Sequence, residues 1–314
     1  MIKFGVILHV TAPWANWKNF LKITHEAERL GYDSIWVTDH LLSPKGRSHG
    51  FEAWTILSAL AAVTKKIRLG TYVICNQFRH PSLLAKMVST IDHISNGRFE
   101  LGIGAGWFKE EHISFGFNWD KISARINRLT ESILLMKRLW TENTVSFNGV
   151  YYKTVNATLN PKPIQKPHPP IWMGGKSQAI KELVAKEGSG WIPVLLSPEE
   201  FSKGLIEIKK NMERIGRNFN QLNIALGGAA YTLLIDDKNL VQKHLKEISI
   251  YRDVPLDKLN YLIGDSSFCI EKINQYKNVG VKQIITGFLD FPALNSMKAF
   301  AHSIIPEFKS KITS

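Results

Sequence analysis

The chain alternates short apolar runs with segments of helical periodicity almost throughout, and this alternation limits the folds open to it. The run at residues 4–8 is typical of a strand buried on both faces of a parallel sheet. The next segment carries apolar residues at spacings of three and four, which mark one face of a helix: Phe20, Ile23, Ala27 and Leu30. Strands that alternate with helices in this way indicate an α/β protein.

The strand–helix pattern recurs eight times over the 314 residues. The predicted strands cover 4–8, 34–37, 67–74, 99–103, 171–173, 191–196, part of 222–235, and 283–285. Eight such units in a single domain, residues 1–314, most naturally close into a TIM (β/α)8 barrel. A doubly wound open sheet is the alternative.

Two segments are predicted as insertions. In residues 144–154, strand-like runs flank Asn148-Gly149, which suits the positive backbone angles of a type I′ turn and predicts a hairpin. Residues 236–264 are mostly helical in pattern. Five prolines between 161 and 170 predict a stiff extended segment, either a domain boundary or a long loop within one barrel.

Composition and charge exclude several classes of protein. No run reaches 18 consecutive apolar residues, so no transmembrane helix is expected. Cys75 and Cys269 lie far from any second Cys or His at metal-ligand spacing, so neither a disulfide framework nor a metal site is predicted. The first residues form a strand pattern rather than a secretion signal, so we expect a cytoplasmic protein. The net charge of +13 comes from scattered residues, which favours a solvated surface over a nucleic-acid groove.

Chemistry-bearing residues follow the predicted strands, where a TIM barrel carries its working residues. Asp39-His40 follows the second strand, and this pair could bind and protonate a reacting group. A structural histidine beside a loop-capping aspartate is the alternative, and position alone leaves both open. Asn76 follows the third strand. Trp107 and Trp191 also lie at strand ends and are candidates for lining a pocket, whereas Glu110-Glu111-His112 is interpreted as the solvated start of a helix.

Glycines follow the fourth and fifth strands. Gly102, Gly104 and Gly106 recur at period two, which does not match a dinucleotide fingerprint and favours close approach of a backbone or a flat ligand. Gly174-Gly175-Lys176-Ser177 resembles the tail of a phosphate loop, although Pro170 occupies the place of the leading glycine. Flexible glycines that lead into a helix favour phosphate binding over a plain tight turn.

Several runs together resemble the bacterial luciferase-like superfamily, over nearly the whole chain. Within that superfamily the chain is most similar to the branch that uses the deazaflavin coenzyme F-420. The runs that carry the resemblance are 31–40, 68–73, 78–81, 84–87, 92–98, 100–107 and 169–175.

The resemblance implies a TIM barrel with an insertion near strand 7, a bound flavin or deazaflavin, and a homodimer. By the same resemblance, Asp39 and His40 lie beside the reactive edge of the ring, with His40 as proton donor or acceptor and Asp39 positioning it or the coenzyme. Tyr72-Val73 matches a non-prolyl cis peptide in a bulge behind the ring. The remaining residues expected to bind the coenzyme are Asn76, Gly104, Gly106, Trp107, Gly174, Gly175 and Lys176.

Two departures from the sugar-phosphate dehydrogenases of that branch disfavour glucose 6-phosphate as substrate. Pro44 stands where they have a tryptophan, and Trp107 replaces their acidic catalytic residue. The leading hypothesis is hydride transfer between coenzyme F-420 and a small organic substrate. An FMN-dependent monooxygenase that uses reduced flavin and O2 is the first alternative, and a non-enzymatic coenzyme-binding protein is the second.

Overall fold

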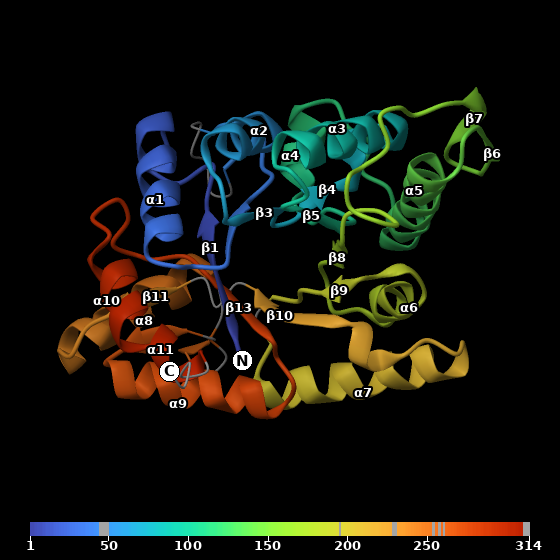
Figure 1. Ribbon diagram of the computed structural model, residues 1–314. Helices are drawn as coiled ribbons and strands as arrows, with labels where there is room; N and C mark the ends of the chain where they lie inside the picture. The colour runs from blue at the N-terminus through green and yellow to red at the C-terminus, as the bar shows by residue number, and fades with distance from the viewer. Residues whose placement is uncertain are drawn as a thin grey trace, which may run out of the picture.

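The fold is a closed barrel of parallel strands surrounded by helices, seen in a computed structural model that describes residues 1–43, 50–194, 196–227, 231–252, 255–256, 259 and 261–309 (Figure 1). Within these residues, eight positions of the barrel are filled by β1 (Lys3–Leu8), β2 (Ser34–Val37), β3 (Arg68–Thr71) with β4 (Ile74–Cys75), β5 (Phe99–Gly104), β8 (Ile171–Met173), β9 (Gly190–Trp191), β10 (Asn223–Gly227) and β13 (Gln283–Thr286). The ring closes because β1 pairs with both β2 and β13, and β3 pairs with β5. The predicted TIM barrel is confirmed.

Helices cover the outside of this barrel, and Figure 1 shows α2 and α3 on one side of the strands with α7 and α9 on the other. The helices and helical turns of the described chain are α1 (Trp17–Arg29), α2 (Ala53–Val63), η1 (Asn76–Phe78), α3 (Pro81–Ile94), α4 (Lys109–Ser114), α5 (Ile122–Thr141), α6 (Gln178–Glu187), α7 (Pro198–Arg214), η2 (Phe219–Gln221), α8 (Lys238–Arg252), α9 (Ser266–Asn278), α10 (Asn295–Ser303) and α11 (Ile305–Phe308).

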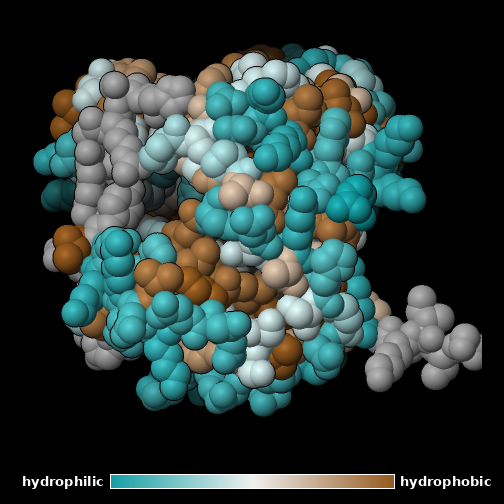
Figure 2. Space-filling model, turned by 90° about the vertical axis from the view of Figure 1, so that its left-hand side faces the viewer, coloured by the Kyte–Doolittle hydropathy of each residue, from teal (hydrophilic) through white to brown (hydrophobic). Residues whose placement is uncertain are grey.

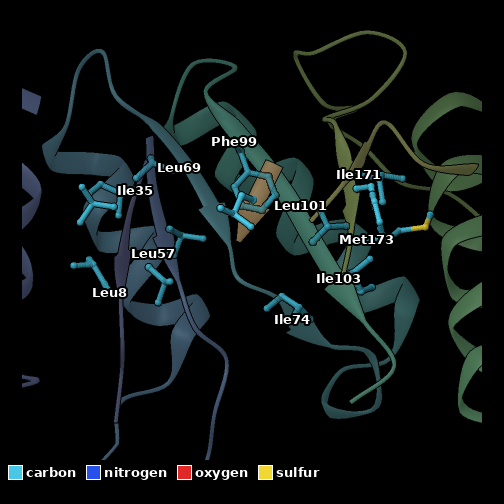
Figure 3. Close-up of a cluster of buried hydrophobic side chains, with 14 of the residues drawn as sticks. Leu8, Ile35, Leu57, Leu69, Ile74, Phe99, Leu101, Ile103, Ile171 and Met173 are labelled. Carbon is cyan, nitrogen blue, oxygen red and sulfur yellow. The ribbon is translucent and has the colours of Figure 1, made fainter. Parts of the chain in front are cut away.

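The main core lies between the strands and the helices. Outward-facing residues of the strands, among them Ile35, Leu69 and Leu101, are buried together with Leu57 of α2 (Figure 3). Since alternate strand residues point to opposite faces, the residues between them point into the barrel. A run of apolar residues is therefore buried on both sides, as the sequence pattern indicates.

The barrel interior is filled by two tryptophans. Trp36 and Trp172 meet edge to face with ring centroids 5.7 Å apart. Their indoles lie against Gly70 and Gly190, where any Cβ would collide with the rings. Each indole N–H is satisfied: Trp36 donates to Ser34 Oγ at 2.8 Å and Trp172 to Glu100 Oε2 at 2.6 Å. A ligand therefore cannot enter the middle of the barrel.

The hairpin near 144–154 is confirmed, but its predicted turn is wrong. β6 (Val145–Asn148) pairs with β7 (Lys153–Ala157), and Asn148 lies opposite Lys153, so the loop has four residues, 149–152. Neither Asn148 nor Gly149 has a positive φ. The reason is Glu131 of α5, whose carboxylate accepts hydrogen bonds from the amides of residues 150, 151 and 152 and holds an open loop.

The insertion near 236–264 is helical only in part. α8 occupies Lys238–Arg252, but β12 (Leu262–Gly264) is a strand that pairs in parallel with β11 (Thr232–Leu234). The predicted strand 191–196 is also shorter than expected, because Pro193 has no N–H for the ladder and pairing continues only as a bridge from Val194 to Gly227. The strands before and after the proline-rich segment belong to one sheet, so that segment is a loop within the barrel.

Candidate active site

The predicted site residues lie at the carboxyl ends of neighbouring parallel strands, which we call the mouth of the barrel. Asp39-His40 follows β2, Asn76 follows β4, Gly106-Trp107 follows β5, and Gly174 to Lys176 follows β8. Because parallel strands end at the same side of a sheet, these segments share one end of the barrel. Pro44 lies outside the described residues.

The predicted strand 67–74 is interrupted at the mouth by a bulge. Leu69 pairs with Phe99, whereas Ile74 pairs with Ile103. The difference in residue number between partners falls from 30 to 29, so the segment between Leu69 and Ile74 contains one residue more than the part of β5 that it pairs with. The Tyr72–Val73 peptide in this bulge is cis, as the resemblance implies. The Thr71 hydroxyl replaces ladder hydrogen bonds, since it accepts from Gly102 N at 2.9 Å and donates to Gly102 O at 2.7 Å.

Glycines surround the side chain that the bulge presents. A Cβ at Gly104 or Gly174 would lie 3.0 or 3.1 Å from Val73 Cγ2, closer than ordinary contact. A Cβ at Gly102 would strike the backbone carbonyl of Thr71. The period-two glycines thus allow neighbouring atoms to lie close to β5. The backbone of Thr71 approaches Gly102, and the side chain of Val73 approaches Gly104. Val73 is partly buried in the cluster that fills the barrel.

His40 is paired with a carboxylate that the sequence analysis did not select. Its Nδ1 lies 3.2 Å from Glu111 Oε2, and Glu111 Oε1 accepts hydrogen bonds from the amides of Leu41 and Leu42. The interpretation of Glu110-Glu111-His112 as solvated is wrong for two of the three residues: Glu111 is 2% and His112 1% exposed. The reason is that the short helix α4 turns this side toward the loops after β2 and β4.

Asp39 is buried and fully engaged with a different part of the site. It accepts from the amide of Cys75 at 2.9 Å and from both terminal nitrogens of Arg79 at 2.8 and 3.0 Å. Arg79 also pairs with Glu52. Burial acts to lower the pKa of Arg79, but the two carboxylates outweigh it and raise that pKa. Asp39 therefore ties the loop after β2 to η1, and the ring of His40 takes its hydrogen bond from Glu111 instead.

Two polar groups next to Asp39 lie in the interior. Asn76 is fully buried, and neither polar atom of its amide makes a hydrogen bond of normal geometry. Cys75 Sγ lies 3.4 Å from His112 Nε2, while His112 Nδ1 donates to Phe108 O at 2.8 Å. Burial raises the pKa of the Cys75 thiol to about 12. This thiol is therefore neutral and is not an activated nucleophile.

The loop after β8 presents backbone amides. The N–H of Gly174 donates a hydrogen bond to Ile103 O at 3.1 Å. The N–H groups of Gly175 and Lys176 make no hydrogen bond to any part of the chain that the structure describes. Gly175 has a φ of +112°, a conformation that favours glycine. The loop runs straight into α6, whose first turn adds the positive end of a helix dipole. This is an arrangement that can hold an anion.

The two candidate pocket tryptophans have different places. Trp107 is 62% exposed, stacks on Phe108 and meets the His40 ring edge to face at 5.7 Å. Trp191 is completely buried and donates to Gly175 O at 2.9 Å, so the prediction that it lines a pocket is wrong. Gly190 faces Trp172 inside the barrel, so the next residue, Trp191, points outward and packs on Phe201 of α7, where its indole supports the amide loop from behind.

The face on the left-hand side of Figure 1 carries a hollow with hydrophobic side chains gathered beside it (Figure 2).

No three His, Cys, Asp or Glu side chains among the described residues are arranged to hold a metal ion. No helix in the same residues is long and apolar enough to cross a membrane.

Known proteins resemble this chain along most of its length. The FMNH(2)-dependent dimethylsulfone monooxygenase of Pseudomonas putida is 26% identical over 91% of this chain and 86% of its own. The F420-dependent glucose-6-phosphate dehydrogenase of Segniliparus rotundus is 24% identical over 98% of both chains. A solved F420-dependent secondary alcohol dehydrogenase, in complex with an F420-acetone adduct, has the same fold, with a TM-score of 0.87 and 21% identity over 98% of this chain and 99% of that one. The family described as luciferase-like monooxygenase matches residues 2–254, and this chain belongs to that family.

Proposed function

We propose that this protein is an oxidoreductase that transfers a hydride between coenzyme F-420 and a small organic substrate bound beside His40. The observation that carries the proposal is the combination of three parts at the mouth: an imidazole paired with a carboxylate, the partly buried side chain of Val73 packed against glycines, and a loop of unpaired amides at Gly175 and Lys176. The F420-dependent relatives among the characterised proteins and solved structures support the choice of coenzyme.

The residues present fit a tricyclic coenzyme with a phosphate-bearing tail. The glycines at 104 and 174 let Val73 lie close to their backbone, and a side chain at either position would displace Val73. The amide loop before α6 suits the phosphate. The amide of Asn76 is buried beside the Tyr152 hydroxyl and makes no hydrogen bond of normal geometry, so a ligand or an ordered water could complete its hydrogen bonding.

When bound, the coenzyme supplies the hydride chemistry, and the protein supplies orientation and proton transfer. His40 is the group that gives or takes the proton that must accompany the hydride when a hydroxyl and a carbonyl are interconverted. The rings of Trp107 and Phe108 meet the imidazole edge to face, with centroids 5.7 and 6.5 Å away. Asp39, through Arg79 and the Cys75 amide, fixes the loop that carries Asn76.

The second candidate is an FMN-dependent monooxygenase that uses reduced flavin and O2. It is favoured by the similarity to the FMNH(2)-dependent enzyme of Pseudomonas putida over 91% of this chain. The amide loop before α6 would serve the phosphate of FMN as well. In either case we expect a cytoplasmic homodimer that acts on a small molecule, with no nucleic-acid partner and no membrane attachment.

Titration of the apo-protein with F-420 and with FMN, followed by quenching of ring fluorescence, tests the proposal. Micromolar binding of F-420 with weak binding of FMN supports it. Micromolar binding of FMN alone overturns the preference and selects the monooxygenase. Failure of both to bind refutes a redox role for this site. A panel of alcohols and carbonyl compounds, monitored at the ring absorbance, then identifies the substrate.

A further inference from the structure

We infer that Glu111 is a positioning residue: its carboxylate holds the proton of the neutral His40 imidazole on Nδ1 and leaves Nε2 as the atom that exchanges a proton with the substrate. The placement of the ring proton is a property of the protein alone. Only the exchange with substrate rests on the proposed function, so the two parts can fail separately.

The geometry around the imidazole determines which nitrogen carries the proton. An ionised carboxylate has only lone pairs to offer, so the hydrogen between His40 Nδ1 and Glu111 Oε2, 3.2 Å apart, comes from the imidazole. A neutral imidazole has one N–H, so Nε2 is then an acceptor. His40 Nε2 makes no hydrogen bond to the described part of the chain, and the side chain of His40 keeps 19% of its surface exposed.

The same carboxylate also fixes the backbone next to the imidazole. Glu111 Oε1 accepts from the amides of Leu41 and Leu42, and the side chain of Glu111 is 3% exposed. Imidazole, loop and carboxylate are therefore joined across the ends of β2 and β5. The neighbouring carboxylate, Asp39, does not accept a hydrogen bond from the imidazole among the described residues. Both of its oxygens are occupied by Arg79 and the Cys75 amide.

The variant Glu111→Gln separates the two tasks of this side chain. Its amide oxygen can still accept from Leu41 and Leu42, which preserves the loop. Its NH2 group, however, donates to His40 Nδ1 and moves the imidazole proton to Nε2. In a carboxylate–imidazole pair of a serine protease, the equivalent change imposes the wrong tautomer and lowers kcat about 10⁴-fold. We expect a loss of about 10²–10⁴-fold here, the usual range for general acid–base catalysis.

The first test reads the tautomer without coenzyme or substrate. Protein labelled with ¹⁵N in its ten histidines is examined by NMR under mildly alkaline conditions, and His40 is assigned by its absence from His40→Ala. The expected wild-type spectrum has a protonated Nδ1 and an unprotonated Nε2, and Glu111→Gln reverses them. A wild-type His40 with its proton on Nε2 overturns the inference, whether or not the variant folds.

The second test uses kinetics with a matched control. Glu110→Gln makes the same change on the neighbouring, exposed carboxylate and should leave turnover unchanged. Glu111→Gln should lower kcat while the dissociation constant of the coenzyme stays within about two-fold. The double variant His40→Ala with Glu111→Gln should be no slower than His40→Ala alone, because the carboxylate acts through the imidazole. Independent, multiplying losses would show a merely structural role. If Glu111→Gln reverses the tautomer as expected but the wild-type protein binds no coenzyme, the inference about the ring proton stands and the proposed function is refuted.

Discussion

The buried ion pair beneath the mouth allows a stability prediction with a defined size. Arg79 donates to both oxygens of Asp39 at 2.8 and 3.0 Å and also pairs with Glu52. The side chains of Arg79 and Asp39 are 9% and 1% exposed. Arg79→Met leaves the Asp39 carboxylate in the interior with only the amide of Cys75. Removal of one partner from a buried pair costs about 3–5 kcal/mol, and the low exposure of both groups places this pair in that range.

The assay is urea denaturation followed by circular dichroism, which gives the apparent free energy of unfolding for each variant. The double variant Asp39→Asn with Arg79→Met removes the stranded charge and should be about 1–3 kcal/mol more stable than Arg79→Met alone. Arg138→Met is the control, because Arg138 pairs with Glu142 on the surface, where both side chains are about 40% exposed, and its loss should cost about 0–1 kcal/mol. If Arg79→Met costs no more than the control, or if the double variant is the less stable one, the assignment of Asp39 to a buried ionic role is refuted.

Three further outcomes are expected. Gly174→Ala places a Cβ 3.1 Å from Val73 Cγ2 and should weaken coenzyme binding about ten-fold, or about 1.4 kcal/mol, in the quenching titration; unchanged affinity would remove Val73 from the ring surface. Cys75, whose pKa burial raises to about 12, stays protonated well above neutral pH, so iodoacetamide should label it only after unfolding, as read by mass spectrometry; rapid labelling of the native protein would contradict this. Glu131→Ala removes the acceptor for three amides of the hairpin loop and should raise hydrogen exchange at 150–152 without changing turnover; protection equal to wild type would show that the loop is held by other contacts.

Most of the barrel could be predicted because its signals are local. The bounds of β2 and β8 agree with the predicted 34–37 and 171–173. α7 begins with Ser197 as its cap, Pro198 in the first turn and Glu200 completing a capping box, so every signal lies within four residues. Such elements depend little on the rest of the fold.

The bulge and the turn of the hairpin could not be found in this way. The run 67–74 has no local mark of an extra residue, and only the family resemblance indicated a break at Tyr72-Val73. Asn148-Gly149 does carry a strong local turn signal, but Glu131 lies in another element and offers the loop amides better partners than a two-residue turn would. At the hairpin, a tertiary contact outweighed a local preference.

Glu111 was missed for a related reason. Its partner His40 is 71 residues earlier in the chain, and two acidic residues at the start of a helix are also what a solvated helix would have. Glu110 and Glu111 differ by one step around the helix, which leaves one exposed and buries the other. The usable signal was position: a short helix that directly follows a strand end must turn one side toward the mouth of the barrel.

The filling of the barrel explains why a site on this chain has to be built from loops. The inward positions are Ser34 and Trp36 along β2, and Gly70 followed by Tyr72 along β3 and the bulge. The middle layer of the barrel contains the large side chains of Trp36 and Trp172. At the next layer toward the mouth, the inward positions of β5, β8 and β10 lead to Gly104, Gly174 and Gly227. The space over these glycines is taken by larger neighbours: Tyr72 lies against Gly227, and Val73 lies against Gly104 and Gly174. Because Trp36 and Trp172 fill the middle of the barrel, a ligand has to lie across its end, over Tyr72 and Val73, and the loops that follow the strands have to supply the rest of the site.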